Sequence, residues 1–137
     1  MSTKSKGSRG ERELFHLLWK HGYGVVRSAG SGSTSQPSPD LLASNGKRTL
    51  AIECKSIRGE KKYFSAEELE QLHIFAEAFG AEAWLAIRFD NKGWFFLLAE
   101  KIPQSKGKNY LVSYSQLQKE GLLFEELIGK FVQERLQ

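Results

Sequence analysis

The sequence predicts a mixed β-sheet covered by helices, within one α/β domain that spans residues 1–137. Two segments, 8–22 and 65–79, carry apolar residues at helical spacing. Short apolar runs separated by turn residues lie between and after them, and Asn45-Gly46 is the strongest hairpin signal. The resulting order is one helix, three strands, a second helix and two strands, which implies a mixed sheet with helices packed on it.

The N-terminal part is expected to hold a helix, a strand and a loop. Residues 1–7 are polar and basic, so we expect a flexible tail, and Ser8 can cap the helix that ends near Gly22. A β-strand is expected over 23–28. Residues 29–39 are rich in Gly, Ser and Pro without periodicity, which predicts a mobile surface loop.

Two strands, 40–43 and 48–56, flank the Asn-Gly turn, and a charged loop over 58–62 follows them. Ser65, with Glu68 three residues later, is a capping box for the second helix. The remaining elements are expected in this order: strands at 83–89 and 93–99, a loop at 101–109, a short strand at 111–114 and a helix at 124–136.

The composition is that of an ordinary soluble globular protein, with 40% hydrophobic and 26% charged residues. Its apolar runs are far shorter than the roughly 20 residues that a membrane helix needs. The N-terminus lacks the apolar segment of a secretory signal, and the single Cys54 allows neither an intrachain disulfide nor a thiolate zinc site. We therefore expect a cytoplasmic protein without a membrane partner.

Charge is unevenly distributed along the chain. Residues 1–62 contain twelve basic and five acidic residues, whereas residues 63–137 contain eight and eleven. The basic first half indicates a polyanionic partner. Charge alone does not identify that partner, because basic surfaces bind nucleic acids, anionic membranes and acidic proteins alike.

The predicted hairpin brings two acids and a lysine together. If Asn45 and Gly46 are the loop residues of a type I′ turn, Ser44 pairs with Lys47 and Asp40 faces Ala51. Because side chains alternate along a strand, Glu53 and Lys55 lie on the face of Asp40, which is then a diagonal neighbour of Glu53. The opposite face of this strand carries Leu50, Ile52 and Cys54 and is available for packing.

Glu11 is a candidate fourth member of the cluster, because helical spacing places it in the middle of the apolar arc. The structural alternatives remain open. Glu11 could close a capping box with Ser8. Asp40 could be a solvated strand end, and Glu53 and Lys55 could be a surface ion pair. As a set, the three acids can hold Mg²⁺ through oxygen ligands, while the lysine orients water or neutralises developing charge.

Pro39-Asp40 followed by Glu53-Cys54-Lys55 resembles the PD…(D/E)xK motif of restriction-endonuclease-like nucleases. The wider sequence blocks closely resemble the archaeal Holliday junction resolvases of the Hjc type, and this resemblance extends through the second helix and the strands up to Leu98. These blocks are Gly7-Ser8-Arg9-Gly10-Glu11-Arg12-Glu13-Leu14, Gly24-Val25-Val26-Arg27-Ser28-Ala29-Gly30-Ser31, Pro39-Asp40-Leu41-Leu42 and Ile52-Glu53-Cys54-Lys55-Ser56. The C-terminal third matches only loosely. Cys54 departs from the aliphatic residue or Met common in the family, at a position that is expected to face the core.

The resemblance implies a restriction-endonuclease-like core and a homodimeric nuclease of recombination and repair, in the cytoplasm with the nucleoid. Such an enzyme uses Mg²⁺, with Mn²⁺ as a substitute, to nick four-way DNA junctions symmetrically. Glu11, Asp40 and Glu53 match the family's metal-binding acids, and Lys55 matches its catalytic lysine. Ser31 matches the serine implicated in catalysis, a role that Ser33 or Ser35 could also take.

The resemblance also implies that Arg12 and Arg27 contact phosphate. Arg9, Arg58, Lys61 and Lys62 flank the predicted site and are expected to follow the DNA backbone, although each could serve solubility instead. Tyr63-Phe64 is either a stacking pair for DNA or a buried anchor, of which the anchor is favoured. The acidic second half makes poor DNA-binding surface, so we expect the dimer interface on the second helix or the later strands.

Two other functions stay open at this level. The chain could be a related nuclease that acts on another DNA structure or a short sequence, or a junction-binding module without catalysis. Protein partners from replication or repair are not identified by the sequence.

Overall fold

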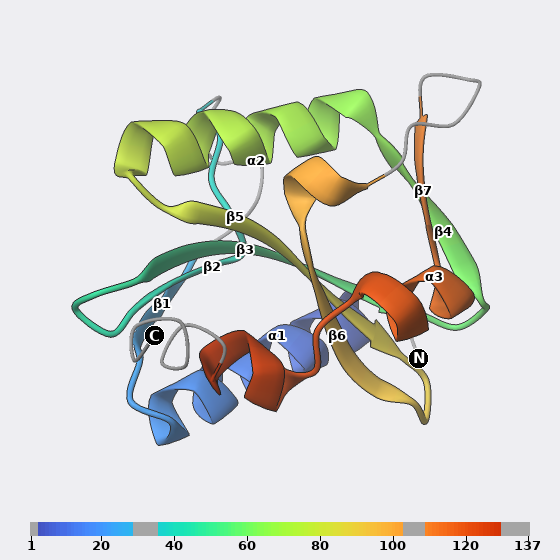
Figure 1. Ribbon diagram of the computed structural model, residues 1–137, viewed down its shortest axis with the longest axis horizontal. Coiled ribbons are helices and arrows are strands. Elements are labelled where there is room, and N and C mark those ends of the chain that lie inside the picture. The colour runs from blue at the N-terminus through green and yellow to red at the C-terminus, as the bar shows by residue number, and fades with distance from the viewer. Residues whose placement is uncertain (1–2, 29–35, 103–108, 130–137) are drawn as a thin grey trace.

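The computed structural model describes residues 3–28, 36–102 and 109–129, and the side chains among them from residue 9 onward. Five strands form a mixed sheet in the order β1-β2-β3-β5-β6, while β4 and β7 form a separate two-stranded ribbon. The strands are β1 (Gly24–Arg27), β2 (Leu41–Ser44), β3 (Thr49–Ile57), β4 (Lys61–Ser65), β5 (Glu82–Phe89), β6 (Gly93–Leu98) and β7 (Asn109–Ser113). Figure 1 shows helices α1 (Thr3–Lys20) and α2 (Ala66–Phe79) on opposite sides of the sheet. This architecture confirms the predicted fold class.

Helix α1 begins at Thr3 and not at Ser8. Residues 3–7, expected as part of a flexible tail, therefore have helical backbone, and Met1 and Ser2 lie outside the described residues. Ser8 lies inside the helix, which excludes the capping box with Glu11. The lysines of this stretch have high helix propensity, so a potential capping residue at Ser8 does not oblige the helix to start there.

The hairpin of β2 and β3 differs in register from the prediction. Ser44 pairs with Thr49 and not with Lys47, and Leu41 pairs with Ile52. The turn is centred one residue later because Oδ1 of Asn45 accepts the backbone N–H groups of Lys47 and Arg48, at 2.9 and 2.8 Å. Every cross-strand pair shifts by two residues, so each side chain keeps its predicted face.

Strand β5 pairs with β3 in parallel, with Ile52 opposite Trp84, and α2 forms the crossover between them. The capping box at the start of α2 is confirmed: Oγ of Ser65 accepts the N–H of Glu68, and the Glu68 carboxylate accepts the N–H of Ser65. Gly80 ends the helix at φ +77°, a left-handed conformation that glycine adopts without strain.

Three elements near the ribbon were not predicted. Lys61 and Lys62, expected in a loop, begin β4, which pairs with β7 along its whole length. A 3₁₀ turn, η1 (Ala99–Lys101), follows β6, and α3 (Tyr114–Glu120) follows β7. Of the expected helix at 124–136, residues 124–129 are helical and the rest lies outside the described residues. None of the described helices is long and apolar enough to cross a membrane.

Each face of the sheet has its own buried core. Leu14 and Leu18 of α1 pack with alternate residues of β3, including Leu50 and Ile52, and with Phe124 from the C-terminal segment. On the other face, α2, β4, β7 and α3 pack against the remaining positions of β3, namely Ala51 and Ile57. Glu53 and Lys55 follow Ala51 in this alternation, so both side chains lie on the α2 face.

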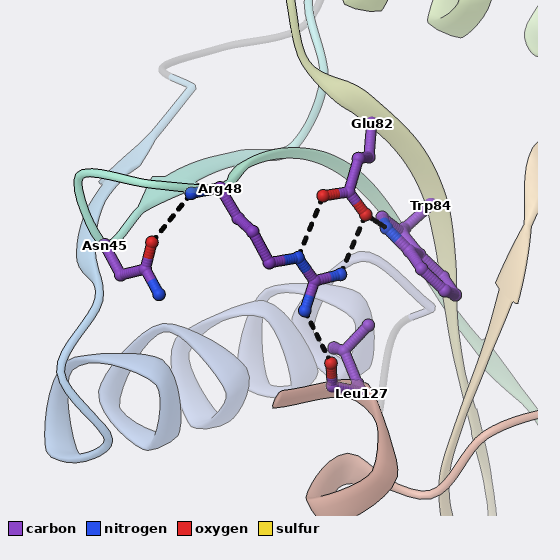
Figure 2. Close-up of polar contacts among 5 residues, drawn as sticks. All are labelled: Asn45, Arg48, Glu82, Trp84 and Leu127. Atoms are coloured by element: carbon purple, nitrogen blue, oxygen red, sulfur yellow. Dashed lines mark hydrogen bonds and ion pairs between the residues drawn. The ribbon is translucent and has the colours of Figure 1, made fainter. Parts of the chain in front are cut away.

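A buried arginine joins the C-terminal segment to the sheet (Figure 2). Arg48 is 7% exposed, and its Nε and Nη2 donate to the two carboxylate oxygens of Glu82 at 2.9 and 2.8 Å. Its Nη1 donates to the carbonyl of Leu127 at 2.7 Å, and Nε1 of Trp84 donates to Glu82 at 3.0 Å. This bidentate pair holds together the N-terminal ends of the parallel strands β3 and β5.

We expect Arg48→Met to lower the free energy of unfolding by about 3 kcal/mol, because Glu82 then keeps a partly buried charge without its partner. Urea unfolding followed by circular dichroism measures this loss. Lys47→Met, at the exposed neighbouring position, should change stability by less than about 0.5 kcal/mol. A loss for Arg48→Met no larger than that of this control would contradict the stabilising role of the Arg48–Glu82 pair.

Candidate active site

The candidate site lies where β3 extends beyond its neighbour β2. Strand β2 starts at Leu41, opposite Ile52, whereas β3 continues to Ile57. Among the described residues, no strand pairs with the β2 side of β3 after Ile52, so we call this stretch the open edge of β3, and its backbone groups need other partners. One of these partners is Asp40, whose Oδ2 accepts the N–H of Cys54 at 2.8 Å.

Asp40 and Glu53 meet at this open edge. The two-residue register shift places Asp40 opposite Glu53 when the β2–β3 pairing is continued by one residue, where the predicted register made them diagonal neighbours. Burial, together with the charge and hydrogen bond of Asp40, raises the pKa of Glu53 to about 8. Without a cation, this pair holds a proton at neutral pH.

Lys55 lies on the same face of β3, two residues after Glu53. Its Nζ is 3.1 Å from Oε1 of Glu68 on α2 and 6.0 Å from the ring centre of the buried Phe64. Burial by itself would lower the pKa of Lys55, but the carboxylates of Glu68, Glu53 and Asp40 outweigh it and raise that pKa. The lysine is therefore a cation that three acids surround.

Glu11 approaches the site from the α1 face of the sheet. Its side chain is 19% exposed, and Oε1 accepts from Nε of Arg27 at 3.4 Å. Burial and then the charge of Asp40 raise the pKa of Glu11. Gly10 allows this approach, since a Cβ there would lie 3.1 Å from Oγ of Ser56 on β3. The helical carboxylate thus points toward the sheet edge, within electrostatic reach of Asp40.

The acids fit a hard cation in part. Asp40 and Glu53 supply a pair of carboxylates whose mutual repulsion a cation would relieve, and oxygen ligands of this kind suit Mg²⁺. Glu11 adds a third carboxylate only across the sheet edge. Among the residues described, no three His, Cys, Asp or Glu side chains are placed together to hold a metal. Asp40 and Glu53 are therefore the metal-binding candidates that the geometry favours.

The remaining predicted site residues are dispersed around this edge. Arg9 and Arg12 are exposed on α1, and Arg27 at the end of β1 pairs with Glu11. Further exposed basic side chains are those of Arg58, between β3 and β4, and of Lys61 and Lys62 on β4. Ser31, Ser33 and Ser35 lie outside the described residues, as does most of the expected 29–39 loop.

Burial distinguishes the roles of the adjacent aromatic residues Tyr63 and Phe64 and fixes the surroundings of the Cys54 thiol. Phe64 is 1% exposed and anchors β4, as favoured, whereas Tyr63 is 50% exposed. Cys54 faces the α1 core, as expected for its position in β3. Burial, followed by the nearby carboxylates, raises the pKa of its thiol well above the ordinary value, so the thiol is neutral.

Sequence reasoning missed Glu68 as a neighbour of Lys55. The capping box identified Glu68 as the residue that bonds back to Ser65, but one carboxylate has two oxygens, and the second faces Lys55 at 3.1 Å. It also missed Glu13, which accepts from Nε1 of Trp94 at 2.9 Å and pairs with Arg88 at 3.4 Å. Only the packing of helices on the sheet brings these groups together.

Comparison with known proteins gives one consistent family. Residues 2–136 match the family described as "Archaeal holliday junction resolvase (hjc)". The chain is 44% identical to the crossover junction endodeoxyribonuclease Hjc of Archaeoglobus fulgidus, over 96% of either chain. It is 38% identical to the protein of that name from Methanocaldococcus jannaschii, over 91% of this chain and 88% of that protein.

A solved structure of Archaeoglobus fulgidus Hjc, a Holliday junction resolvase from an archaeal hyperthermophile, has the same fold. It superposes with a TM-score of 0.82 at 39% identity, over 88% of this chain and 98% of that chain.

We expect the metal-free protein to lose stability as pH rises from about 4.5 to about 8. The unfolded chain releases the Glu53 proton near its ordinary pKa of 4.5, whereas the folded protein holds it up to about 8. Within this window the loss reaches up to about 1.4 kcal/mol per pH unit. Urea unfolding in EDTA at several pH values, for the parent and for Glu53→Gln, measures it.

Glu53→Gln should remove this pH dependence, while Glu60→Gln at an exposed position should keep it. A difference in unfolding free energy between the parent and Glu53→Gln that stays constant across the window would contradict the shifted pKa.

Proposed function

This chain belongs to the archaeal Holliday junction resolvase (Hjc) family, and on that basis we propose that Asp40, Glu53 and Lys55 form its Mg²⁺-dependent cleavage site. The protein is a crossover junction endodeoxyribonuclease, which resolves Holliday junctions in DNA recombination and repair. The observation that carries the proposed site is the Asp40–Glu53 pair on the open edge of β3, where burial and repulsion between the acids favour a bound cation.

Each residue has a distinct part in the proposed cleavage. Asp40, held by the N–H of Cys54, and Glu53 provide the carboxylate oxygens for the ion. Bound Mg²⁺ supplies an acidified water and offsets charge on the scissile phosphate. Lys55 donates a hydrogen bond to the attacking water or to a phosphate oxygen, and its positive charge stabilises the charge that develops there. Glu11, on α1, adds a third carboxylate to the proposed site.

The basic side chains around the edge are proposed to hold the junction arms. Arg9, Arg12 and Arg27 lie on the α1 side, and the chain also offers Arg58, Lys61 and Lys62 near β4. Contacts of this kind bind phosphate without reading the base sequence, which suits an enzyme that selects DNA by shape. Ser31 keeps its proposed catalytic role. Such an enzyme works in the cytoplasm with the nucleoid.

We also propose that the enzyme is a homodimer that uses the outer face of α2. Ile74 and Phe79 are 50% and 55% exposed, and Phe79 stacks on Phe75 with ring centres 5.4 Å apart. Because residues four apart lie on one side of a helix, Phe79 shares its face of α2 with Phe75, while Ile74 projects at a wide angle to that face. Large exposed apolar side chains such as that of Phe79 are typical of an interface. Two symmetric cuts require two active sites, so an isologous contact through α2 is the natural arrangement.

The function is tested by parallel cleavage of a four-way junction, a flap and a linear duplex, with Mg²⁺, with Mn²⁺ and with EDTA. We expect paired nicks in the junction alone and only with a metal. Equal rates on the linear duplex would favour a nuclease for another DNA structure. Junction binding without cleavage under all conditions would favour a binding module.

We expect Asp40→Asn and Glu53→Gln to lower the single-turnover cleavage rate by about 1000-fold, because each removes a charge that holds the ion at the phosphate. Junction affinity in a gel-shift assay should remain within a few-fold of the parent. Glu60→Gln changes an exposed carboxylate outside the site and should cleave at the parental rate. A Glu53→Gln enzyme with parental activity would refute the proposed site.

We expect Phe79→Glu to convert a dimer into a monomer of 15.5 kDa, because it places a charge in the proposed apolar interface. Sedimentation at micromolar concentration measures the mass of the parent and the variant. Leu123→Glu is the matched control, since Leu123 is 49% exposed and lies outside α2. A monomeric parent, or a dimeric Phe79→Glu, would exclude this interface.

A further inference from the structure

Lys55 has a closer partner than the two acids of the cleavage site. Its ammonium lies 3.1 Å from Oε1 of Glu68, on the first turn of α2. From this contact we propose that Glu68 is a positioning residue, which holds the Lys55 ammonium in its working place. This inference rests on the proposed function, since it takes Lys55 as a catalytic group.

Glu68 is itself held at one of its carboxylate oxygens. Oε2 accepts the backbone N–H of Ser65 at 3.0 Å and lies 3.3 Å from Oγ of Ser65. Oε1 stays available for Lys55. The capping box therefore ties one carboxylate oxygen to the start of α2 and aims the other at β3. A side chain restrained in this way can restrain its partner.

Lys55 needs such restraint because a lysine is a point charge on a flexible four-carbon stem. Phe64 limits its movement from one side, with the ring centre 6.0 Å from Nζ. Asp40 and Glu53 also attract the ammonium. If the lysine moved onto those carboxylates, it would compete with the cation that they are proposed to bind. Glu68 supplies an alternative anion, which leaves the Asp40–Glu53 pair accessible.

The same geometry allows a purely structural explanation, in which Glu68 only caps α2. The two roles separate chemically. Glutamine at this position of a capping box still accepts the N-cap N–H, so Glu68→Gln preserves the cap. It removes the negative charge that faces Lys55. Glu67→Gln makes the same charge change in the same helical turn, where Glu67 contacts Gln71 and not Lys55.

The experiment measures three quantities for the parent, Glu68→Gln and Glu67→Gln: the single-turnover cleavage rate of a synthetic four-way junction at saturating enzyme and Mg²⁺, the junction Kd, and the urea midpoint of unfolding. We expect Glu68→Gln to cleave about 10- to 100-fold more slowly, the effect of a catalytic group displaced by about 1 Å. Its Kd and urea midpoint should match the parent. Glu67→Gln should match the parent in all three.

Parental cleavage by Glu68→Gln would overturn the inference, and so would an equal rate loss in Glu67→Gln. A urea midpoint that falls together with the rate would reduce Glu68 to a helix cap and would also overturn it. Lys55→Ala, measured in parallel, distinguishes this failure from failure of the proposed function. If Lys55→Ala cleaves at the parental rate, the catalytic lysine itself is refuted.

Discussion

The hydrogen bond from the N–H of Cys54 to the carboxylate of Asp40 is the contact on which the site depends. Strand β3 extends beyond β2, so the N–H of Cys54, which points to the β2 side, has no β2 residue to pair with. Asp40 supplies the missing acceptor from the residue just before β2. This hydrogen bond therefore satisfies a backbone donor at the sheet edge and also holds the Asp40 carboxylate beside Glu53. The pairing of the two acids is thus a consequence of the unequal lengths of β2 and β3.

The site combines groups from both faces of the sheet because it lies at an edge. Helix α1 brings Glu11, which pairs with Arg27 of β1, from one side, and α2 brings Glu68 to Lys55 from the other. A residue in the interior of the sheet would contact only the helix on the face to which its side chain points, either α1 or α2. The acids and the lysine are partly desolvated there, so their charges act on one another more strongly than they would in water. Such an environment favours binding of a cation and of an anionic phosphate.

The two ends of the parallel pair β3 and β5 have opposite chemistry. At their N-terminal ends, Arg48 and Glu82 form a closed bidentate pair that also holds the carbonyl of Leu127. Nε, Nη1 and Nη2 of Arg48 each donate to an oxygen of Glu82 or Leu127. Further along β3, Asp40 and Glu53 repel each other, and the neighbouring Lys55 forms its 3.1 Å ion pair with Glu68 instead. The first arrangement stabilises the fold, and the second leaves charge available for a ligand.

Local sequence determined much of this protein. Helical spacing, the Ser65–Glu68 capping box and the alternation along β3 depend only on neighbouring residues, so they predicted α2, the strands of the main sheet and the common face of Glu53 and Lys55. The register of the hairpin, the partner of Lys55 and the β4–β7 ribbon were decided by tertiary structure. The side-chain amide of Asn45 sets the position of the turn. The packing of α2 on the sheet places Glu68 beside Lys55. Strand β4 pairs with β7, which lies almost fifty residues later in the chain. These features depend on the relative energies of long-range contacts, which cannot be judged from any short stretch of sequence.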